Sequence, residues 1–457
     1  MKRVLLCLLA FIPVLYSSAQ SYSTSPFSSR GLGEWGTFTD PIFGALGNTS
    51  TAVYDSMTVN TYNPASYASL SKGQPLFSAG VAGRVSVYSQ SGNTKNGYSV
   101  GLSNITMVVP ANKYIGFAVG LRPAFRKGYE TSQYATDHSG DYKYIYQGSG
   151  IGQEVFGGLA ANILKTPRHE WSIGGNVGYI FGQITDRRFS LALNSDGVGG
   201  AEEKINKLHA LNYSFGTSYT YKFNTLGHRF LRIGAVYQPQ QNYSATRERS
   251  LYLIPGVDSD TSDVYNTDTY VLLDSTVGDR GHFVQPATLS LGFSYVFTPE
   301  VGLDYKHKSI YQVGIYGDFT QTMWKNYSEQ FSTVAASPYM NSSRVSLGVM
   351  FTPNYNWSEK VTGQSFLKRA RYRVGAYMGN TPYSQNGTQV KEIVGTLGIG
   401  LPMSVLRSNS SINFSLQYGN RGTGRSGDLN ERFFAFGIGF IFAPAPYERW
   451  FVKRKVD

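Results

Sequence analysis

Side chains that could support catalysis or bind a metal occur singly along this chain of 457 residues. The six histidines show no pair at metal-ligand spacing, and neither a GxSxG nor an HExxH motif is present. The histidines are His138, His169, His209, His228, His282 and His307. Gly31 to Gly36 (GLGEWG) formally matches a dinucleotide fingerprint, but the strand and helix that such a site requires are not predicted around it. We therefore expect no enzyme, no catalytic residue and no cofactor.

Four acidic residues in a predicted loop are the remaining candidate for a cation site: Asp258, Asp260, Asp263 and Asp268. Their carboxylate oxygens are ligands that hard cations accept. The spacing lacks the glycine and the terminal glutamate of an EF-hand, so charged residues in a solvated loop are the favoured interpretation. We predict no metal site.

The N-terminus predicts export. Met1, Lys2 and Arg3 precede an apolar stretch over 4–16, and small residues follow, which is typical of a signal peptide over residues 1–19. The single cysteine, Cys7, lies in that stretch, so the mature chain is expected to hold no thiol and no disulfide. The chain has 41 Lys and Arg against 29 Asp and Glu. A basic exported protein favours an anionic lipid surface over nucleic acid as its partner.

Apolar and polar residues alternate with period two through most of the remaining chain. Val345, Leu347, Val349 and Phe351 alternate with polar or small neighbours, as a strand with one apolar face requires. The pattern predicts fourteen strands over 76–89, 97–109, 114–126, 152–164, 170–187, 206–223, 228–249, 283–297, 309–322, 342–354, 369–380, 391–402, 410–420 and 431–443.

The predicted connections are mostly short at one end of these strands and long at the other. The long connections are 127–151, 188–205, 250–282 and 323–341. Short turns at one rim and long loops at the other are typical of a bacterial outer-membrane barrel. We therefore predict an all-β fold, a 14-stranded antiparallel transmembrane β-barrel over 76–443, followed by a periplasmic tail over 444–457.

Residues 20–75 do not fit the strand pattern. They contain many glycines and prolines among scattered apolar residues, too hydrophobic for a linker and too irregular for strands. Because this stretch precedes the first strand, we predict that it folds into the lumen as an N-terminal plug, or hatch. A periplasmic tail is the alternative.

The sequence resembles the FadL/TodX family of outer-membrane channels for long-chain fatty acids and other hydrophobic compounds, particularly its members from Bacteroidota. The similarity spans nearly the whole mature chain. It is carried by Asn63, Pro64 and Ala65, LSNITMVVP (102–110), GFAVGLRP (116–123), YIYQGSG (144–150), GIGLP (398–402), QYGNRG (417–422) and WFVKRKVD (450–457). The resemblance implies a fourteen-strand barrel with a hatch, an extracellular capture groove and passage of ligands through the wall. It also covers PorV-like relatives that act as accessory proteins in secretion, and others in barrel assembly.

Pro123 falls inside the third predicted strand and cannot donate a ladder hydrogen bond, so the ladder should open or kink there. The resemblance implies that Pro123, with Gly120 and Gly128, forms a lateral window. Alternatively, Pro123 lies above the membrane where the strand frays.

The predicted loop 250–282 carries an unusual apolar load: Leu251, Leu253, Ile254, Val271, Leu272 and Leu273. These residues form either the capture groove that the resemblance implies or a surface packed against the loop itself or a partner. Four arginines are expected to face the lumen: Arg232, Arg344, Arg371 and Arg373. They could bind a carboxylate head group, but pairing with plug or lumen carboxylates is the favoured interpretation.

The main hypothesis is a channel in the Gram-negative outer membrane for hydrophobic compounds, working by diffusion without a nucleotide or redox cofactor. The alternative is a non-transporting accessory subunit of an outer-membrane secretion or barrel-assembly machine. The expected partners are outer-membrane lipid and lipopolysaccharide, hydrophobic small molecules, and a protein complex in the second case. No nucleic acid is expected.

Overall fold

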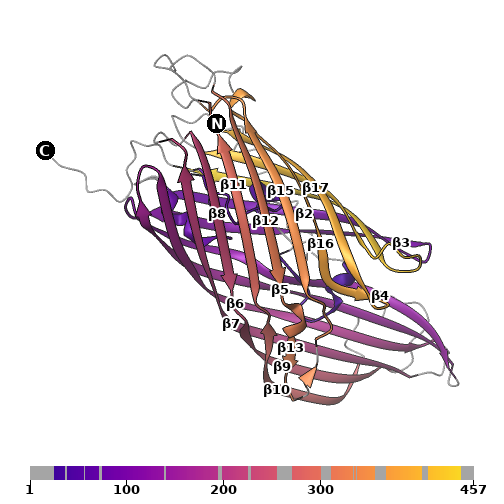
Figure 1. Cartoon of the computed structure of the whole chain (residues 1–457). Coiled ribbons are helices and arrows are strands. Elements are labelled where there is room, and N and C mark those ends of the chain that lie inside the picture. Colours follow the sequence, from indigo (N-terminus) through magenta and orange to yellow (C-terminus); the bar gives the residue numbers. More distant parts are fainter. Residues whose placement is uncertain are drawn as a thin grey trace, which may run out of the picture.

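The computed structural model describes residues 25–36, 39–55, 57–70, 75–137, 140–193, 198–224, 228–254, 270–299, 310–332, 334–335, 337–355, 367–403 and 410–443. Fourteen antiparallel wall strands form a closed barrel, and the last strand pairs with the first (Figure 1). Within the described part of the chain, no helix has the length and apolar character needed to cross a membrane. The signal peptide, the acidic residues 258–268 and the C-terminal tail predicted above lie outside the described residues.

All fourteen predicted strands correspond to wall strands, although several wall strands extend well beyond the predicted bounds. They are β2 (Leu76–Gln90), β3 (Asn93–Pro110), β4 (Ile115–Asp137), β5 (Gly140–Lys165), β6 (His169–Ala192), β7 (Gly199–Lys222), β8 (Arg229–Gln238) with β9 (Gln241–Ile254), β10 (Val271–Gln285) with β11 (Thr288–Phe297), β12 (Gln312–Thr322), β15 (Ser342–Thr352), β16 (Arg371–Gln385), β17 (Thr388–Pro402), β18 (Ser411–Gly422) and β19 (Asn430–Phe442).

Two predicted strands are each divided in two by a proline. The break between β8 and β9 contains Pro239, and the break between β10 and β11 contains Pro286. A proline has no N–H to donate to the ladder, so regular pairing stops at each site. The two breaks lie in neighbouring wall strands, because β11 pairs with β8 and β10 pairs with β9.

The outer face of the barrel is apolar at the level of the short strands. Val345, Leu347 and Val349 on β15 are 49%, 56% and 38% exposed, while Ser346 between them is buried. The period-two pattern therefore places large apolar side chains outward and small or polar ones inward, as expected for a barrel in lipid.

Three of the four predicted long loops are wrong. Most of 127–151, 188–205 and 250–282 continues the flanking strands, so that β4, β5, β6 and β7 contain 23, 26, 24 and 24 residues. About 10 residues suffice for a tilted strand to cross a bilayer. One side of the wall therefore projects far beyond the membrane, and Figure 1 shows these purple and magenta strands running past the orange and yellow ones. Of the four, the connection 323–341 is the one whose described residues remain mostly a loop.

The N-terminal segment, residues 25–70, lies inside the barrel. It contains η2 (Pro26–Ser29), β1 (Glu34–Trp35), α2 (Pro41–Gly44) and η3 (Pro64–Ser69). Asp40 caps α2 by accepting from the N–H of Ile42, and Asn63 caps η3 by accepting from Ala65. The asparagine of the predicted Asn63-Pro64-Ala65 motif also donates through Nδ2 to Thr217 O on β7 at 3.3 Å.

Glycines on the inner face of the wall allow this segment to approach closely. A Cβ at Gly348 would lie 2.5 Å from the carbonyl oxygen of Leu46, so the backbone contact requires glycine there. Gly47 has a φ of 66° and lies between the carbonyl oxygens of Leu347 and Ala376. Inward glycines on the wall thus create the space that the N-terminal segment fills.

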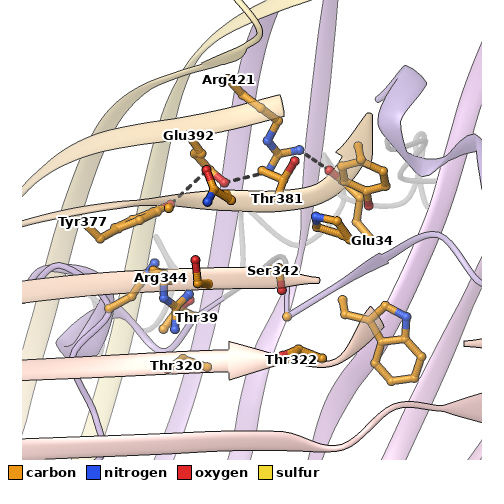
Figure 2. Close-up of a pocket in the computed structure, with 18 of the residues that line it drawn as sticks. Glu34, Thr39, Thr320, Thr322, Ser342, Arg344, Tyr377, Thr381, Glu392 and Arg421 are labelled. Carbon is orange, nitrogen blue, oxygen red and sulfur yellow. Dashed lines mark hydrogen bonds and ion pairs between the residues drawn. The ribbon is translucent and has the colours of Figure 1, made fainter. Parts of the chain in front are cut away.

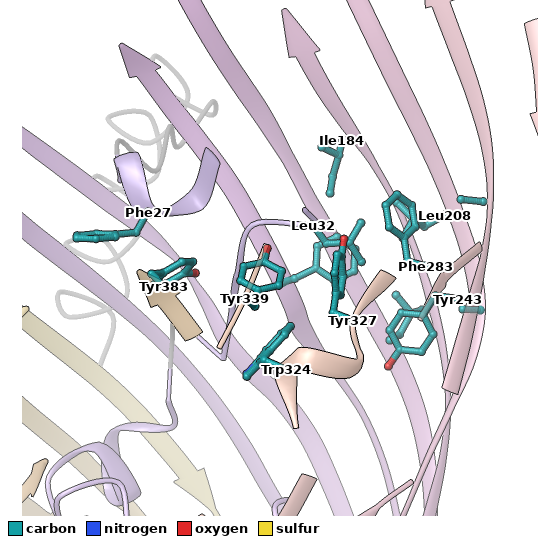
Figure 3. Packing of buried hydrophobic residues seen from close by; sticks show 14 of the residues in the cluster. Phe27, Leu32, Ile184, Leu208, Tyr243, Phe283, Trp324, Tyr327, Tyr339 and Tyr383 are labelled. Carbon is teal, nitrogen blue, oxygen red and sulfur yellow. The ribbon is translucent and has the colours of Figure 1, made fainter. Parts of the chain in front are cut away.

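A cluster of aromatic side chains packs inside the lumen, toward the end that lies opposite to the beginning of β2 and the end of β19. The loop 323–341, with η7 (Trp324–Asn326), β13 (Ser328–Gln330) and β14 (Val334–Ala335), supplies Trp324, Tyr327 and Tyr339 to this cluster. Figure 3 shows Phe27 and Leu32 of the N-terminal segment among these rings. The ring centres of Phe27 and Tyr383 are 5.5 Å apart. The N-terminal segment and the loop therefore share one hydrophobic core.

We predict that Gly348→Val loosens the N-terminal segment, because its side chain would collide with the Leu46 carbonyl group. Overpacking of this kind costs about 1–3 kcal/mol. The measurement is the rate at which protease cleaves the N-terminal segment in the detergent-solubilised barrel, together with the Tm.

Gly395→Val is the matched control, since nothing lies within 4 Å of a Cβ at that position. Equal cleavage rates and an equal Tm in the two variants would contradict the proposed packing.

Candidate functional site

The wall is interrupted between β3 and β4, at a place that we call the seam. These strands pair only from Ile105–Leu121 to Pro110–Gly116. Beyond Ile105, residues 93–104 of β3 pair with β2, and no ladder joins them to β4 among the described residues. Pro123 lies two residues past the last pair, and the pairing of β4 with β5 shifts register between Pro123 and Phe125. The ladder therefore opens at the proline.

The N-terminal segment occupies the free edge of β4 at the seam. In strand β1, Glu34 pairs with Arg126 and Trp35 with Phe125. The Arg126 side chain spans the seam and donates through Nη1 to the carbonyl oxygen of Val100 on β3 at 3.2 Å. Thus a short strand and a guanidinium group replace part of the missing β3–β4 ladder.

Gly128 is held by the same segment. The Ser28 hydroxyl group donates to Gly128 O at 2.9 Å and accepts from Gly128 N at 3.0 Å. Gly120 lies at the other end of the seam, and a Cβ there would be 2.8 Å from the Phe156 ring. The three residues predicted for a lateral window, Gly120, Pro123 and Gly128, therefore lie along the seam, but tightly packed groups surround both glycines.

Trp35 fills the inner side of the seam. Its ring centre lies 5.0 Å from that of Phe125, 5.9 Å from Tyr243 and 6.3 Å from Trp324. Since Tyr243 comes from β9 and Trp324 from the loop 323–341, this side chain joins the seam to the aromatic cluster.

An apolar hollow of about 480 Å³ lies on the lipid-facing side, next to the paired end of the seam. Phe77, Ile105, Val119 and Phe440 are among the side chains that line it. Its position is consistent with contact to hydrocarbon, either of a lipid or of an apolar ligand.

The four predicted lumen arginines differ in their partners. Arg371 forms an ion pair with Asp55 of the N-terminal segment at 2.7 Å. Arg232 donates to the carbonyl oxygen of Tyr54 at 3.1 Å, and Arg373 donates to Asn413 on β18 at 3.0 Å. The guanidinium group of Arg344 lies 5.7 Å from the centre of the Tyr377 ring. Two of the four therefore contact the N-terminal segment directly.

A charged network that the sequence interpretation missed holds the same segment. Arg421 forms an ion pair with Glu34, and its Nη2 lies 3.4 Å from Glu392. Arg84 pairs with the fully buried Glu431 at 2.7 Å. The period-two pattern predicts that Arg421 and Glu431 face inward, and both are buried. The sequence does not identify Glu34 as the partner of Arg421, because the two are 387 residues apart.

Glu34, Arg84, Glu392 and Arg421 border a cavity of about 280 Å³ that charged, polar and aromatic side chains line together (Figure 2). Figure 2 shows Glu34, Arg421 and Glu392 connected in a row, with Tyr377 donating to Glu392 at 3.1 Å. Hydroxyl groups of Thr320, Thr322 and Ser342 also lie along the cavity. The chemistry of this lining suits water or a polar group better than a hydrocarbon chain.

The carboxyl group of Asp40 is also enclosed by the wall. Burial raises its pKa to about 6, although the N–H of Ile42 and the charge of Arg373 act in the opposite direction. Asp318 on β12 accepts from the backbone N–H of Ser50 at 2.6 Å and of Thr51 at 2.9 Å. Carboxylates of the wall and of the N-terminal segment therefore both form hydrogen bonds where the two surfaces meet.

The apolar residues predicted to form a loop groove lie on strands instead. Leu253 pairs with Val271, and Leu251 pairs with Asp274, across β9 and β10. Ile254 is buried, whereas Val271, Leu272 and Leu273 are exposed. Leu251 and Leu253 are half-buried on β9, so the six residues do not form one surface.

No cluster of three His, Cys, Asp or Glu side chains suited to a metal ion occurs in the part of the chain that the structure describes.

Solved structures with a similar fold include a hydrocarbon channel and two toluene transporters. The CymD monoaromatic hydrocarbon channel is 13% identical, with a TM-score of 0.54, covering 90% of this chain and 99% of that one. The Ralstonia pickettii toluene transporter TbuX is 16% identical (TM-score 0.54, 89% and 98% covered), and the P. putida toluene transporter TodX is 14% identical (0.54, 89% and 98%). The barrel is therefore of the FadL/TodX outer-membrane type.

Sequence comparison defines the family more closely than this fold does. No protein of curated function matches the sequence. The family model described as BamG matches residues 1–457, which is the entire chain. The resemblance to FadL and TodX thus holds for the fold, while this protein belongs to the BamG family.

Proposed function

We propose that this protein is a non-transporting accessory subunit of the barrel-assembly machinery of the Gram-negative outer membrane. The family name BamG implies association with the Bam complex. The observation that carries the proposal is that the N-terminal segment fills both the lumen and the seam. In this role the barrel is a rigid scaffold, and lipid and lipopolysaccharide surround it.

The free energy needed to open the lumen supports a scaffold. Displacing the N-terminal segment would separate Glu34 from Arg421 and Asp55 from Arg371, and would remove the donors of Asp318. Removing one partner of a buried charge pair costs about 3–5 kcal/mol. Two such losses, about 6–10 kcal/mol together, are already as large as the whole free energy of unfolding of many domains, about 5–15 kcal/mol.

The channel hypothesis has support from the fold and from the apolar hollow beside the seam. The solved relatives named above are described as hydrocarbon channels and toluene transporters. A hydrophobic compound would have to displace Trp35 and Ser28 to pass from the lumen through the seam between Gly120 and Gly128. The cavity next to Arg421 reaches Trp35 at the seam, but a hydrocarbon chain in it would lie against the charged groups of Glu34, Glu392 and Arg421.

Purification of the tagged, full-length protein in mild detergent tests the proposal. We expect it to co-purify at fixed stoichiometry with the central barrel of the assembly machinery, and its deletion should lower the amounts of other outer-membrane barrels. Uptake of long-chain fatty acids and of monoaromatic compounds should not change. A protein that elutes alone, with a deletion strain impaired only in such uptake, would establish the channel instead.

A disulfide that ties the N-terminal segment to β4 at the seam separates the two functions further. Because the only cysteine is Cys7 in the expected signal peptide, the pair Ser28→Cys and Gly128→Cys would be the only thiols of the mature chain. We expect the oxidised pair to leave complex formation and the abundance of other barrels unchanged, since the seam stays closed in a scaffold.

The single Ser28→Cys variant is the control for loss of the serine hydroxyl group. Loss of function that appears only in the oxidised double variant, and is reversed by reductant, would show that the seam must open.

A further inference from the structure

The first half of β10, residues 271–278, is exposed on both faces. Every residue from Val271 to Gly278 is exposed, although a strand in a packed sheet normally buries alternate side chains. The exposed fractions of Val271, Leu272, Leu273 and Val277 are 51%, 54%, 62% and 74%. Large apolar side chains therefore point into solvent from both sides of one strand.

This strand also has a free edge. Residues 271–285 of β10 pair with β9 on one side. On the other side, β13 pairs with His282, Phe283 and Val284, and Ser332 donates to the Asp279 carboxylate at 2.9 Å. Nothing in the described part of the chain pairs with that edge over 271–278, which we call the β10 edge.

The β10 edge lies outside the membrane. It lies in the part of the wall that projects past the ends of the short strands, as Figure 1 shows for β9 and β10. An exposed apolar strand with free backbone N–H and C=O groups is a template for pairing with another strand. Because lipid does not cover this level of the wall, only a protein segment can satisfy both the backbone and the apolar side chains.

The chain itself shows that this edge accepts an added strand. β13 is three residues long, comes from a separate loop and pairs antiparallel with residues 282–284 of β10. A segment added at 271–278 would continue the same row of hydrogen bonds toward the beginning of β10.

Two irregularities restrict which strand fits. The pairing of β10 with β9 shifts register between Leu272 and Asp274 and again between Thr276 and Asp279. Bulges increase the local twist of a strand, which disfavours flat stacking of identical copies. They favour a short extended segment, and Asp274 favours a basic residue opposite it.

We propose that the β10 edge is the docking site for an extended segment of a second subunit exposed at the cell surface. The segment adds as a strand, places apolar residues on both of its faces beside Val271, Leu272 and Val277, and carries a basic residue near Asp274. This inference rests on the proposed function, because it requires a stable complex.

Hydrogen exchange on the full-length protein, alone and in the purified complex, tests this inference. We expect the amide groups of 271–278 to exchange at least about tenfold more slowly in the complex. The double variant Leu272→Lys, Val277→Lys should lose that protection and lower the amount of the bound surface subunit by about tenfold, because edge lysines oppose strand addition.

Val198→Lys is the matched control, since Val198 is 56% exposed on the same projecting wall but lies outside the β10 edge. A complex that forms with unchanged exchange at 271–278 would overturn the inference and leave the proposed function intact. Protection by a second copy of this chain alone would also overturn it. Absence of any complex would instead contradict the proposed function.

Discussion

Satisfaction of backbone hydrogen bonds in a membrane is the constraint on which this structure depends. A barrel in lipid must pair every strand edge, because no water is present to accept or donate. Here the β3–β4 ladder stops before Pro123, and the chain compensates with β1 and with the side chain of Arg126. The N-terminal segment is therefore part of the wall as well as part of the lumen.

The contents of the lumen say more about the role of this barrel than its fold does. Inward glycines such as Gly348 allow backbone contact with the N-terminal segment, and arginines such as Arg371 and Arg421 bind its carboxylates. A fold shared with hydrocarbon channels does not by itself transfer their function. The residues that fill the barrel, more than the barrel itself, favour a scaffold.

Period two predicted all fourteen wall strands, because lipid outside and a packed lumen inside give each strand an apolar and a small or polar face. The same reasoning failed beyond the membrane. Nearly all residues of 130–136 and all residues of 271–278 are exposed and lose the alternation, so the period-two pattern predicts loops there. Pro123 marked the seam from its missing N–H alone. The partner strand β1 could not be predicted, because two residues with irregular flanks carry no periodic signal.

Closure of the barrel also encloses a core that one segment supplies. The N-terminal segment lies inside a ring that the pairing of β19 with β2 completes. Its Phe27 and Leu32 pack against Phe125 of β4, and its Asp55 pairs with Arg371 of β16. The segment that seals the finished barrel is therefore also the core that strands from both halves of the wall share.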